Sequence, residues 1–215
     1  MIEFMRLADL KKRPELYSTM FWDRRKQFCE RLGWPLNSDE WGFEMDQYDG
    51  PEALYVVKVA ENGHHAGSMR LMSLASRTML FDHFEGTIKS ASLDTATVWE
   101  CTRFCTATNE PTSTALAVLT GGARILLGSK LTGLVAVFDA RMERIYQRCG
   151  VPPKILGTHG YPFGSVTAGL WTFNVEAFLQ LLERSGTDPD ELESSLNRSG
   201  AIQFIQSAVP NLTLV

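Results

Sequence analysis

The chain has 215 residues and a mass of 24.1 kDa, which predicts a single domain spanning residues 1–215. Hydrophobic residues make up 44% and charged residues 21%, as in globular proteins and unlike disordered chains. The 21 Lys and Arg and 25 Asp and Glu give a net charge of -4, which argues against a general nucleic-acid binder. No apolar run approaches the ~18 residues of a membrane span, and the N-terminus does not resemble a signal peptide. We therefore expect a cytoplasmic protein with no membrane attachment.

Hydrophobic patterning predicts helices that alternate with strands. Apolar residues at helical spacing, ended by Gly33, predict a helix over 15–33. Asn62-Gly63 predicts a hairpin turn between strands at 54–60 and 66–72. The later elements expected are a short helix or turn at 79–84, a strand at 97–106, a helix at 116–127, a buried strand at 134–138, a helix at 142–148, a last strand at 167–174, and helices at 175–184 and 188–197. This alternation predicts an α/β fold with a mixed sheet covered by helices.

The Cys and His residues do not follow a metal-binding or disulfide pattern. None of the four cysteines are spaced as C-x-x-C, and no H-E-x-x-H motif occurs, so we expect reduced thiols and no metal. His64 and His65 follow the hairpin turn directly and are expected in solvent. Neither a G-x-G-x-x-G turn after a strand nor a P-loop motif is present, so nucleotide binding of those two kinds is not indicated.

Several charged residues lie within apolar or aromatic surroundings. They are Arg24, Asp46, Asp49, Arg70, Glu100 and Arg103, with Glu44 in the same stretch as the two aspartates. A charge inside an apolar strand is costly unless it is paired, so these groups are expected to neutralise one another. Two interpretations stay open: a purely structural ion-pair network, or a charged cluster that borders a cleft and forms a site.

The positions of Glu100 and Arg103 constrain the strand that carries them. In a regular strand the two side chains would point to opposite faces of the sheet. They can serve one site only if the strand bulges or twists near residues 101–103. Alternatively, one side chain faces the cleft and the other braces the outside of the sheet.

Taken in order, these residues resemble the acyl-homoserine-lactone synthases, the autoinducer synthases of bacterial quorum sensing. The resemblance runs from about residue 20 to 150. It includes Arg-Leu-Gly-Trp at 31–34, Asp-Gln-Tyr-Asp at 46–49 and Glu-Cys-Thr-Arg-Phe at 100–104, where the family usually has Glu-Ser-x-Arg-Phe. The resemblance implies an α/β fold related to the GNAT acetyltransferases, with a mixed, splayed β-sheet flanked by helices on both faces.

The resemblance also implies a reaction. S-adenosylmethionine (SAM) is a co-substrate that donates its homoserine part, and an acyl thioester on acyl carrier protein or coenzyme A donates the acyl group. Amide formation and lactonisation give an N-acyl-homoserine lactone, a free thiol and methylthioadenosine. No cofactor, metal or nucleic acid is implied.

The same resemblance suggests roles for individual residues. Glu100 is the expected base for the SAM α-amine, directly or through a water, and its alternative role is to pair with Arg70 or Arg103. A backbone N–H near Phe104 could stabilise the oxyanion if a bulge frees it. The residues expected on the SAM side are Arg24, Phe28, Trp34, Asp46, Asp49, Arg70, Arg103 and Phe104. Those expected around the acyl chain are Met79, Leu80, Leu116, Leu119 and Phe138.

Two other functions are compatible with the predicted fold. One is a coenzyme A-dependent GNAT-type N-acetyltransferase, which would bind pyrophosphate through an R/Q-x-x-G-x-G/A segment that residues 109–114 lack. The other is a non-catalytic relative, against which the presence of all the matched charged residues argues.

Overall fold

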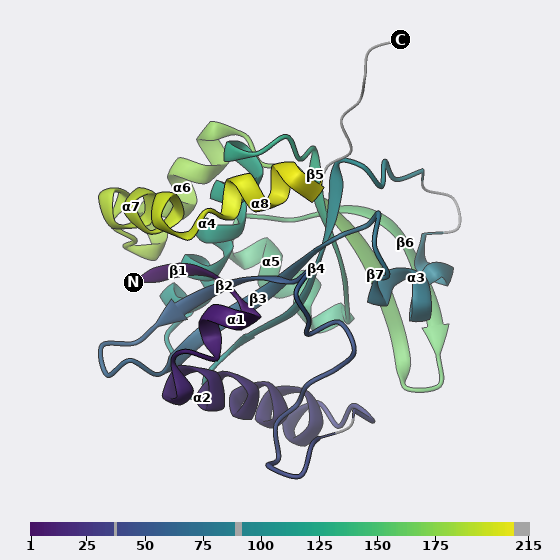
Figure 1. Ribbon diagram of the computed structural model, residues 1–215. Helices are drawn as coiled ribbons and strands as arrows, with labels where there is room; N and C mark the ends of the chain where they lie inside the picture. Colours follow the sequence, from purple (N-terminus) through teal and green to yellow (C-terminus); the bar gives the residue numbers. More distant parts are fainter. Residues whose placement is uncertain (37, 89–91, 209–215) are drawn as a thin grey trace.

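A mixed β-sheet organises the chain. The computed structural model describes residues 1–36, 38–88 and 92–208. Within these ranges the seven strands lie in the order β1-β2-β3-β4-β5-β7-β6, through the middle of the molecule (Figure 1). Their bounds are β1 (Ile2–Arg6), β2 (Leu54–Val59), β3 (His65–Ser73), β4 (Val98–Thr106), β5 (Gly133–Phe138), β6 (Lys154–Tyr161) and β7 (Gly164–Trp171). Neighbouring strands are antiparallel except for β4 and β5, which are parallel.

Helices cover both faces of the sheet, as predicted. Their bounds are α1 (Leu7–Leu10), α2 (Pro14–Arg25), α3 (Met79–His83), α4 (Thr112–Gly128), α5 (Ala140–Arg148), α6 (Val175–Ser185), α7 (Pro189–Ser199) and α8 (Ala201–Ala208). Figure 1 shows α4, α6 and α8 on one side and α1 and α2 on the other. A π-helical turn, Lys26–Arg31, continues α2. No helix in the described ranges combines the length and apolar character needed to cross a membrane.

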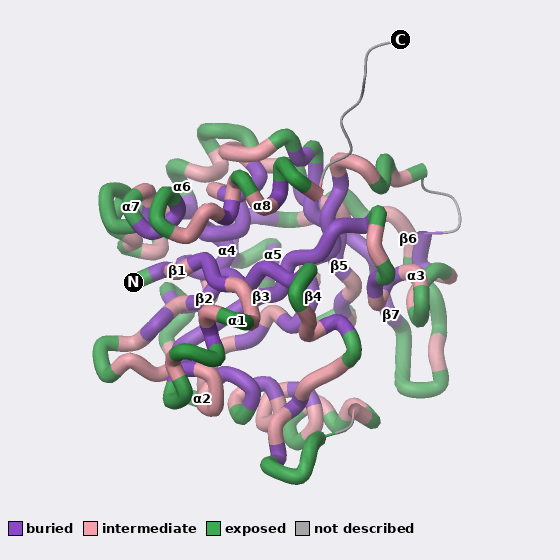
Figure 2. Tube along the Cα trace, in the orientation of Figure 1, coloured by how far each residue is buried: buried purple, intermediate pink, exposed green. Residues whose placement is uncertain are grey.

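Alternating side chains of the strands bind the two helical layers to the sheet. On β2, Leu54 and Val56 pack into the core cluster that contains the apolar residues of α4. Tyr55 and Val57 point the other way, into the cluster that contains the apolar residues of α2. The central strands β2 and β3 are accordingly buried between the layers, as Figure 2 shows.

The sheet splays apart between β4 and β5. The two strands pair only over Val98–Glu100 and Gly133–Val135. Beyond that point β4 pairs with β3 alone, and β5 pairs with β7. The second halves of β4 and β5 therefore border an opening rather than each other.

A β-bulge interrupts β4 at the splayed end, as the sequence predicted for a shared site. Arg70 of β3 pairs with Thr102, and Ser68 pairs with Cys105, so Arg103 and its successor lie opposite one residue of β3. Arg103 has a φ of +53°, which is uncommon for a residue with a side chain. The bulge turns Arg103 to the face of the sheet that carries Arg70, because both guanidinium groups bind the same carboxylate, described below.

The predicted elements are present, with boundaries that differ by a few residues. The expected strand at 167–174 lies at 164–171, and α4 begins four residues before the expected start. Four helices and strands were not predicted: β1, α1, β6 and α8. β1 has only five residues, too few to establish a pattern, and β6 is exposed or half-buried along its length.

His65 is buried, and the expectation that it lies in solvent was wrong. It begins β3 instead of belonging to the turn, and its side chain faces α2. Its Nδ1 lies 2.9 Å from Asp23 Oδ2 and its Nε2 lies 2.9 Å from Ser68 Oγ. Both ring nitrogens thus have partners, which makes burial of the imidazole affordable.

The contact between α4 and the first two strands requires a glycine at position 121. A Cβ at Gly121 would lie 2.5 Å from Val56 Cγ1 and 3.1 Å from Ile2 Cγ2. We expect Gly121→Ala to lower the free energy of unfolding by about 1–3 kcal/mol in urea denaturation, because the core must shift to admit the methyl group. Gly50→Ala is the control, since a Cβ at Gly50 meets no atom within 4 Å. A stabilised Gly121→Ala protein, as helix propensity alone would give, would contradict this packing.

Candidate active site

Six ionised side chains form a closed cycle of ion pairs on the face of the sheet covered by α2. Positive and negative groups alternate, and each group contacts two of opposite charge. We call the cycle the ion-pair ring; its members in order are Arg24, Glu44, Arg103, Asp46, Arg70 and Asp49. Its formal charge is zero, so the cost of removing these charges from water is met by partners on both sides of each group.

Arg24 connects α2 to the segment after the helix. Its Nε lies 2.7 Å from Glu44 Oε2, and its Nη1 lies 2.9 Å from Asp49 Oδ1. Tyr55 Oη also donates to Asp49 Oδ1, at 2.8 Å. Burial alone would raise the pKa of Asp49, but the charges of Arg24 and Arg70 outweigh it and hold that pKa well below its usual range. Asp49 therefore stays ionised in the folded protein.

Asp46 joins the two arginines that come from the strands. Its Oδ1 accepts from Arg70 Nη1 at 2.6 Å, and its Oδ2 lies 2.8 Å from Arg103 Nη2. Arg103 Nη2 also lies 2.9 Å from Glu44 Oε1, and Arg70 Nη1 lies 2.9 Å from Asp49 Oδ1. Asp46 is the most exposed member of the ring, with a side chain 14% exposed. It is thus the carboxylate best placed to meet a ligand.

The segment that carries the two aspartates is shaped by its own polar groups. The Asp46 N–H donates to Asp49 Oδ2 at 3.0 Å, and the Tyr48 N–H donates to Asp46 Oδ1 at 2.9 Å. Such local bonds are typical of Asp at turns. They orient both carboxylates toward the arginines, so the short spacing of 46 and 49 is what lets one loop supply two acids to the ring.

A cavity of about 790 Å³ lies beside the ring, at the opening between β4 and β5. At its polar end are Glu44, Asp46 and Arg103. The rest of its wall is mostly apolar and aromatic and includes Trp34, Tyr48, Met79, Phe84, Val137, Phe138, Phe163 and Val166. An apolar cleft with a few convergent charged groups is the usual form of a small-molecule site.

An aromatic pair connects the ring to one wall of the cavity. The rings of Phe28 and Trp34 stack with centroids 5.3 Å apart, and the Arg103 guanidinium lies 5.5 Å from the centre of the Phe28 ring. The π-helical turn that carries Phe28 places its ring under Arg103. Trp34 faces the cavity and Phe28 supports it from behind.

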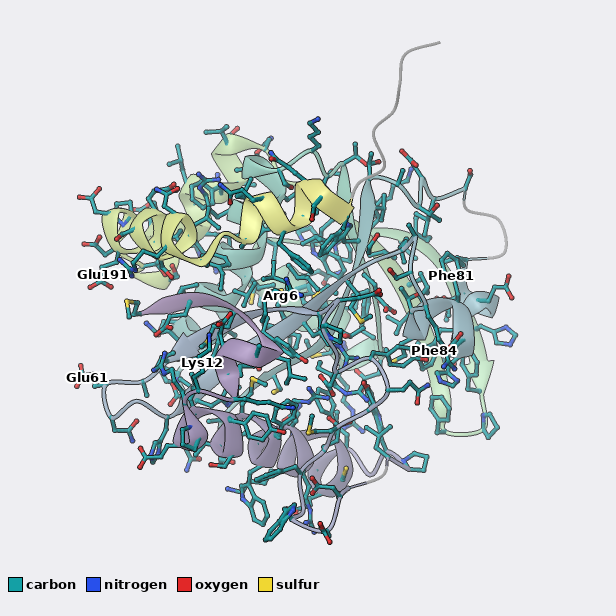
Figure 3. All side chains as sticks on the ribbon, in the orientation of Figure 1. Arg6, Lys12, Glu61, Phe81, Phe84 and Glu191 are labelled. Carbon is teal, nitrogen blue, oxygen red and sulfur yellow. The ribbon has the colours of Figure 1, made fainter. Side chains whose placement is uncertain are left out.

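A second set of aromatic residues closes the end of the cavity that lies away from the ion-pair ring. The tip of the β6–β7 hairpin extends from the sheet beside α3 (Figure 1), and it contributes Phe163 to the cavity wall. Phe84, which follows α3, lies against that hairpin in Figure 3, with its ring centroid 5.3 Å from Tyr161 and 6.3 Å from Phe163. This hairpin and α3 together form the apolar end of the cavity.

Glu100 is buried and takes no part in the ring. Its carboxylate accepts the backbone N–H of Met79 at 3.1 Å and of Leu80 at 2.6 Å. Burial raises its pKa to about 7, against the lowering effect of these amides and of the charges of Arg70 and Arg103. In the described residues Glu100 has no ion pair, since those two arginines bind the ring carboxylates instead. Glu100 itself does not line the cavity, whereas Met79, whose backbone N–H it accepts, does.

The cavity thus brings together some of the residues predicted for the site. Trp34, Asp46, Met79, Arg103 and Phe138 line it. The remaining members of the ring, Arg24, Asp49 and Arg70, are predicted residues that lie beneath it and position Asp46 and Arg103.

Other predicted residues lie elsewhere. The Phe104 side chain points to the opposite face, with its ring 6.3 Å from Tyr146, because the bulge reverses the direction of its side chain. Leu116 and Leu119 belong to the core between α4 and the sheet, and Leu80 packs in the cluster with Val135. None of these four line the cavity. Apolar residues of a core and of a pocket look alike in a sequence, so patterning could not separate them.

Three residues of the ring and the cavity were not among the predicted site residues, although Glu44 had been noted beside the two aspartates. Glu44 completes the ring, and its spacing of two and five residues from the aspartates was the available signal. Phe84 and Phe163 close the cavity, and the latter lies on a hairpin that was only half predicted. A second cavity of about 600 Å³, between α2 and the 60–65 turn, is lined by none of the predicted site residues.

The fold matches those of solved acyltransferases. A coenzyme A-dependent acyl-homoserine lactone synthase solved with SAM and isopentyl-CoA superposes with a TM-score of 0.77, at 16% identity, over 91% of this chain and 98% of the other. An acyl-CoA N-acyltransferase from Pseudomonas aeruginosa superposes with a TM-score of 0.52, at 14% identity, over 78% and 97%. The fold class is therefore that of the GNAT-like acyltransferases, as the sequence resemblance implied.

Sequence comparison narrows this class to one family. The family model described as autoinducer synthase matches residues 8–181. The acyl-homoserine-lactone synthase of Rhizobium etli is 33% identical over 165 residues, covering 72% of this chain and 76% of that protein. The chain therefore belongs to the autoinducer synthase family. The predicted resemblance is confirmed, and the activity of that family, acyl transfer that makes an acyl-homoserine lactone signal for quorum sensing, is the one expected of the site.

The fully buried members of the ion-pair ring, such as Asp49, should be critical for the stability of the fold. We expect Asp49→Asn to lower the free energy of unfolding by about 3–5 kcal/mol, because it leaves the buried charges of Arg24 and Arg70 short of a partner. Urea denaturation measures the change. Asp9→Asn, which removes an exposed ion pair with Lys12, is the control and should cost under about 1 kcal/mol. Equal effects of the two substitutions would contradict a cooperative buried ring.

Proposed function

We propose that SAM and an acyl thioester bind together in the cavity beside the ion-pair ring and react there to form an N-acyl-homoserine lactone. The observation that carries the proposal is the exposed corner of the ring: Asp46 and Arg103 meet the polar end of a cavity whose other end is apolar. SAM has a cationic sulfonium, an ammonium and a carboxylate, whereas the acyl chain is apolar. The two ends of the cavity suit the two reactants.

The ring provides complementary charges for SAM. Asp46 lies where it can attract the sulfonium or ammonium group, and Arg103 can bind the carboxylate. Trp34 offers an aromatic face for the adenine or for the cation. Arg24, Asp49 and Arg70 do not touch the ligand in this proposal, because they are buried beneath the exposed corner; they hold it in position.

The first bond joins the SAM nitrogen to the acyl carbonyl. The neutral α-amine attacks the thioester carbon, the tetrahedral intermediate collapses, the thiolate of the carrier leaves, and the nitrogen loses a proton. A free α-amino group has a pKa of about 7.7–8.0, so a base of moderate strength is sufficient. Glu100, with its pKa raised to about 7, is the proposed acceptor of that proton, through a water that passes Met79 or after that side chain moves.

The second bond closes the lactone. The carboxylate oxygen of the acylated product attacks its γ-carbon, and the bond from that carbon to sulfur breaks, which releases methylthioadenosine. A sulfonium is a good leaving group and the new ring has five members, so the protein mainly needs to hold the chain folded. Orientation of this kind can contribute several kcal/mol.

The acyl chain occupies the apolar end of the cavity in this proposal. Met79 and Phe138, both predicted for that role, lie there with Phe84, Val137 and Phe163. The splayed ends of β4 and β5 leave room for the thioester arm to enter beside Arg103. The donor is carried by acyl carrier protein or coenzyme A, and paired assays of the two distinguish them.

The reaction is tested by its two diagnostic products. The purified chain, SAM and acyl donors of graded length on each carrier should yield methylthioadenosine and an N-acyl-homoserine lactone by mass spectrometry. Thiol release without methylthioadenosine would instead identify a simple N-acyltransferase. Glu100→Gln should lower kcat by about 10²–10⁴-fold with little change in SAM affinity, since it removes the base and leaves the ring intact.

The pH dependence offers a second readout on Glu100. Glu100 is active as a carboxylate, so the activity of the wild type should rise as the pH increases through about 7. The Glu100→Gln variant should lack this rise. The part of the pH dependence that comes from deprotonation of the SAM amine should remain in this variant. Wild-type kcat in Glu100→Gln would contradict the role of this residue.

Asp46 should govern SAM affinity. Asp46→Asn is expected to weaken SAM binding about tenfold in calorimetry, because it removes the one ring carboxylate that is partly exposed to the cavity, a loss of about 1.4 kcal/mol. Asp139→Asn is the control: Asp139 lines the same cavity but caps α5, so SAM affinity should hold. An unchanged dissociation constant in folded Asp46→Asn would remove this residue from the site.

A further inference from the structure

The N-terminus of α3 is capped by a residue from a distant strand. Thr78 occupies the N-cap position with extended backbone angles, φ -132° and ψ 157°. A threonine there normally accepts an amide N–H of the first turn through its hydroxyl. Thr78 makes no such bond; Glu100 of β4 instead accepts the N–H groups of Met79 and Leu80, the first two residues of the helix.

The Thr78 hydroxyl therefore does not cap α3, which is the usual structural role of a threonine at this position. The residue is 0% exposed, and its Oγ1 is one of three buried side-chain polar atoms in the described ranges that have no hydrogen-bond partner. Leaving a buried hydroxyl unpaired costs about 1–3 kcal/mol, and most native proteins pair such groups. A valine has nearly the same shape and would avoid this cost, so packing and capping do not explain the hydroxyl.

Thr78 and Glu100 are both next to the first turn of α3: Thr78 directly precedes Met79, and the Glu100 carboxylate accepts the N–H groups of Met79 and Leu80. An N-cap side chain with extended backbone angles lies over the amides of the first helical turn. Glu100 Oε1 occupies that position, 2.6 Å from Leu80 N. The carboxylate oxygens accept only one amide each, so both keep acceptor capacity for a further donor. Thr78 Oγ1 makes no hydrogen bond to these oxygens in the structure, so the interaction requires the Thr78 side chain to rotate about its Cα–Cβ bond.

We propose that Thr78 is a positioning residue for Glu100, whose hydroxyl hydrogen-bonds the Glu100 carboxyl group during proton transfer from the SAM amine. The inference rests on the proposed role of Glu100 as the base. A hydroxyl suits this task because it donates to the carboxylate before the proton arrives and accepts from the carboxylic acid afterwards. The two backbone amides can only donate, so they favour the charged form alone.

The other charged groups near Glu100 do not take over this task. Arg70 of β3 and Arg103 of β4 face it, but both donate to the carboxylates of the ion-pair ring. They remain cations throughout the reaction and cannot accept a proton from Glu100. Thr78 is the neighbouring side chain that serves both protonation states.

Two substitutions separate positioning from a structural role. Thr78→Val removes the hydroxyl and keeps the shape; we expect kcat to fall tenfold or more, KM for SAM to stay within threefold, and the unfolding temperature to equal or exceed that of the wild type. Thr78→Ser keeps the hydroxyl and loses a buried methyl; we expect kcat within twofold of wild type and a lower unfolding temperature. The Val variant is stable and slow, whereas the Ser variant is less stable and active.

Thr87→Val is the matched control. Thr87 is equally buried and close to α3, but its hydroxyl donates to Phe84 O at 2.7 Å. Its loss should lower stability and leave kcat unchanged. If Thr78→Val does not fold, Thr78→Ala takes its place, with the same loss of kcat expected.

The outcomes that overturn the inference are distinct from failure of the proposed function. Wild-type kcat in Thr78→Val, or loss of kcat in Thr78→Ser equal to that in Thr78→Val, overturns the positioning role while lactone formation and the effect of Glu100→Gln stand. Wild-type kcat in Glu100→Gln overturns both the base and its positioning residue. A wild-type chain that forms no lactone from any donor overturns the proposed function and this inference together.

Discussion

The site depends on how three buried arginines are neutralised. Each guanidinium lies between two carboxylates, and each carboxylate lies between two guanidinium groups, so no charge in the cycle lacks a partner. Because the members come from α2, the 44–49 segment, β3 and β4, the cycle also fixes these four elements relative to one another. The polar end of the cavity is the one part of this arrangement that reaches solvent, at Asp46. The buried members of the network therefore have a structural role, and the proposed contact with a ligand belongs to its most exposed member, Asp46.

The architecture could largely be predicted from local patterns. Asn62-Gly63 located the β2–β3 hairpin, and helical spacing located α2, α4 and α6. The bulge in β4 was one of two alternatives that the sequence left open, because two charged residues three apart in a strand serve one face only if the strand is irregular. Local patterns did not predict the two edge strands of the sheet, β1 and β6. β1 has only five residues, too few for its alternation to be recognised, and β6 is largely exposed, so its side chains show little of the alternation that burial imposes.

The site was predictable where it is charged and unpredictable where it is apolar. A charge inside an apolar strand needs an explanation, and that need identified Arg70, Glu100 and Arg103. An apolar residue inside a helix needs none, so Leu116 and Leu119 of the core were confused with the wall of a cavity. The sequence also did not show which carboxylate pairs with which arginine. Pairing with an arginine was the alternative role considered for Glu100, but the arginines of β3 and β4 bind the acidic segment, and Glu100 binds the first amides of α3 instead.

The burial of the ring has a consequence for how the protein responds to its ionic surroundings. Dissolved ions weaken interactions between charges that water reaches, over distances near 10 Å at 0.1 M salt, and have far less effect on pairs from which water is excluded. Arg24, Glu44 and Asp49 are of the second kind. The scaffold of the site should thus be insensitive to ionic strength, whereas the proposed attraction of a charged ligand to Asp46, the most exposed carboxylate of the ring, should weaken as the salt concentration rises.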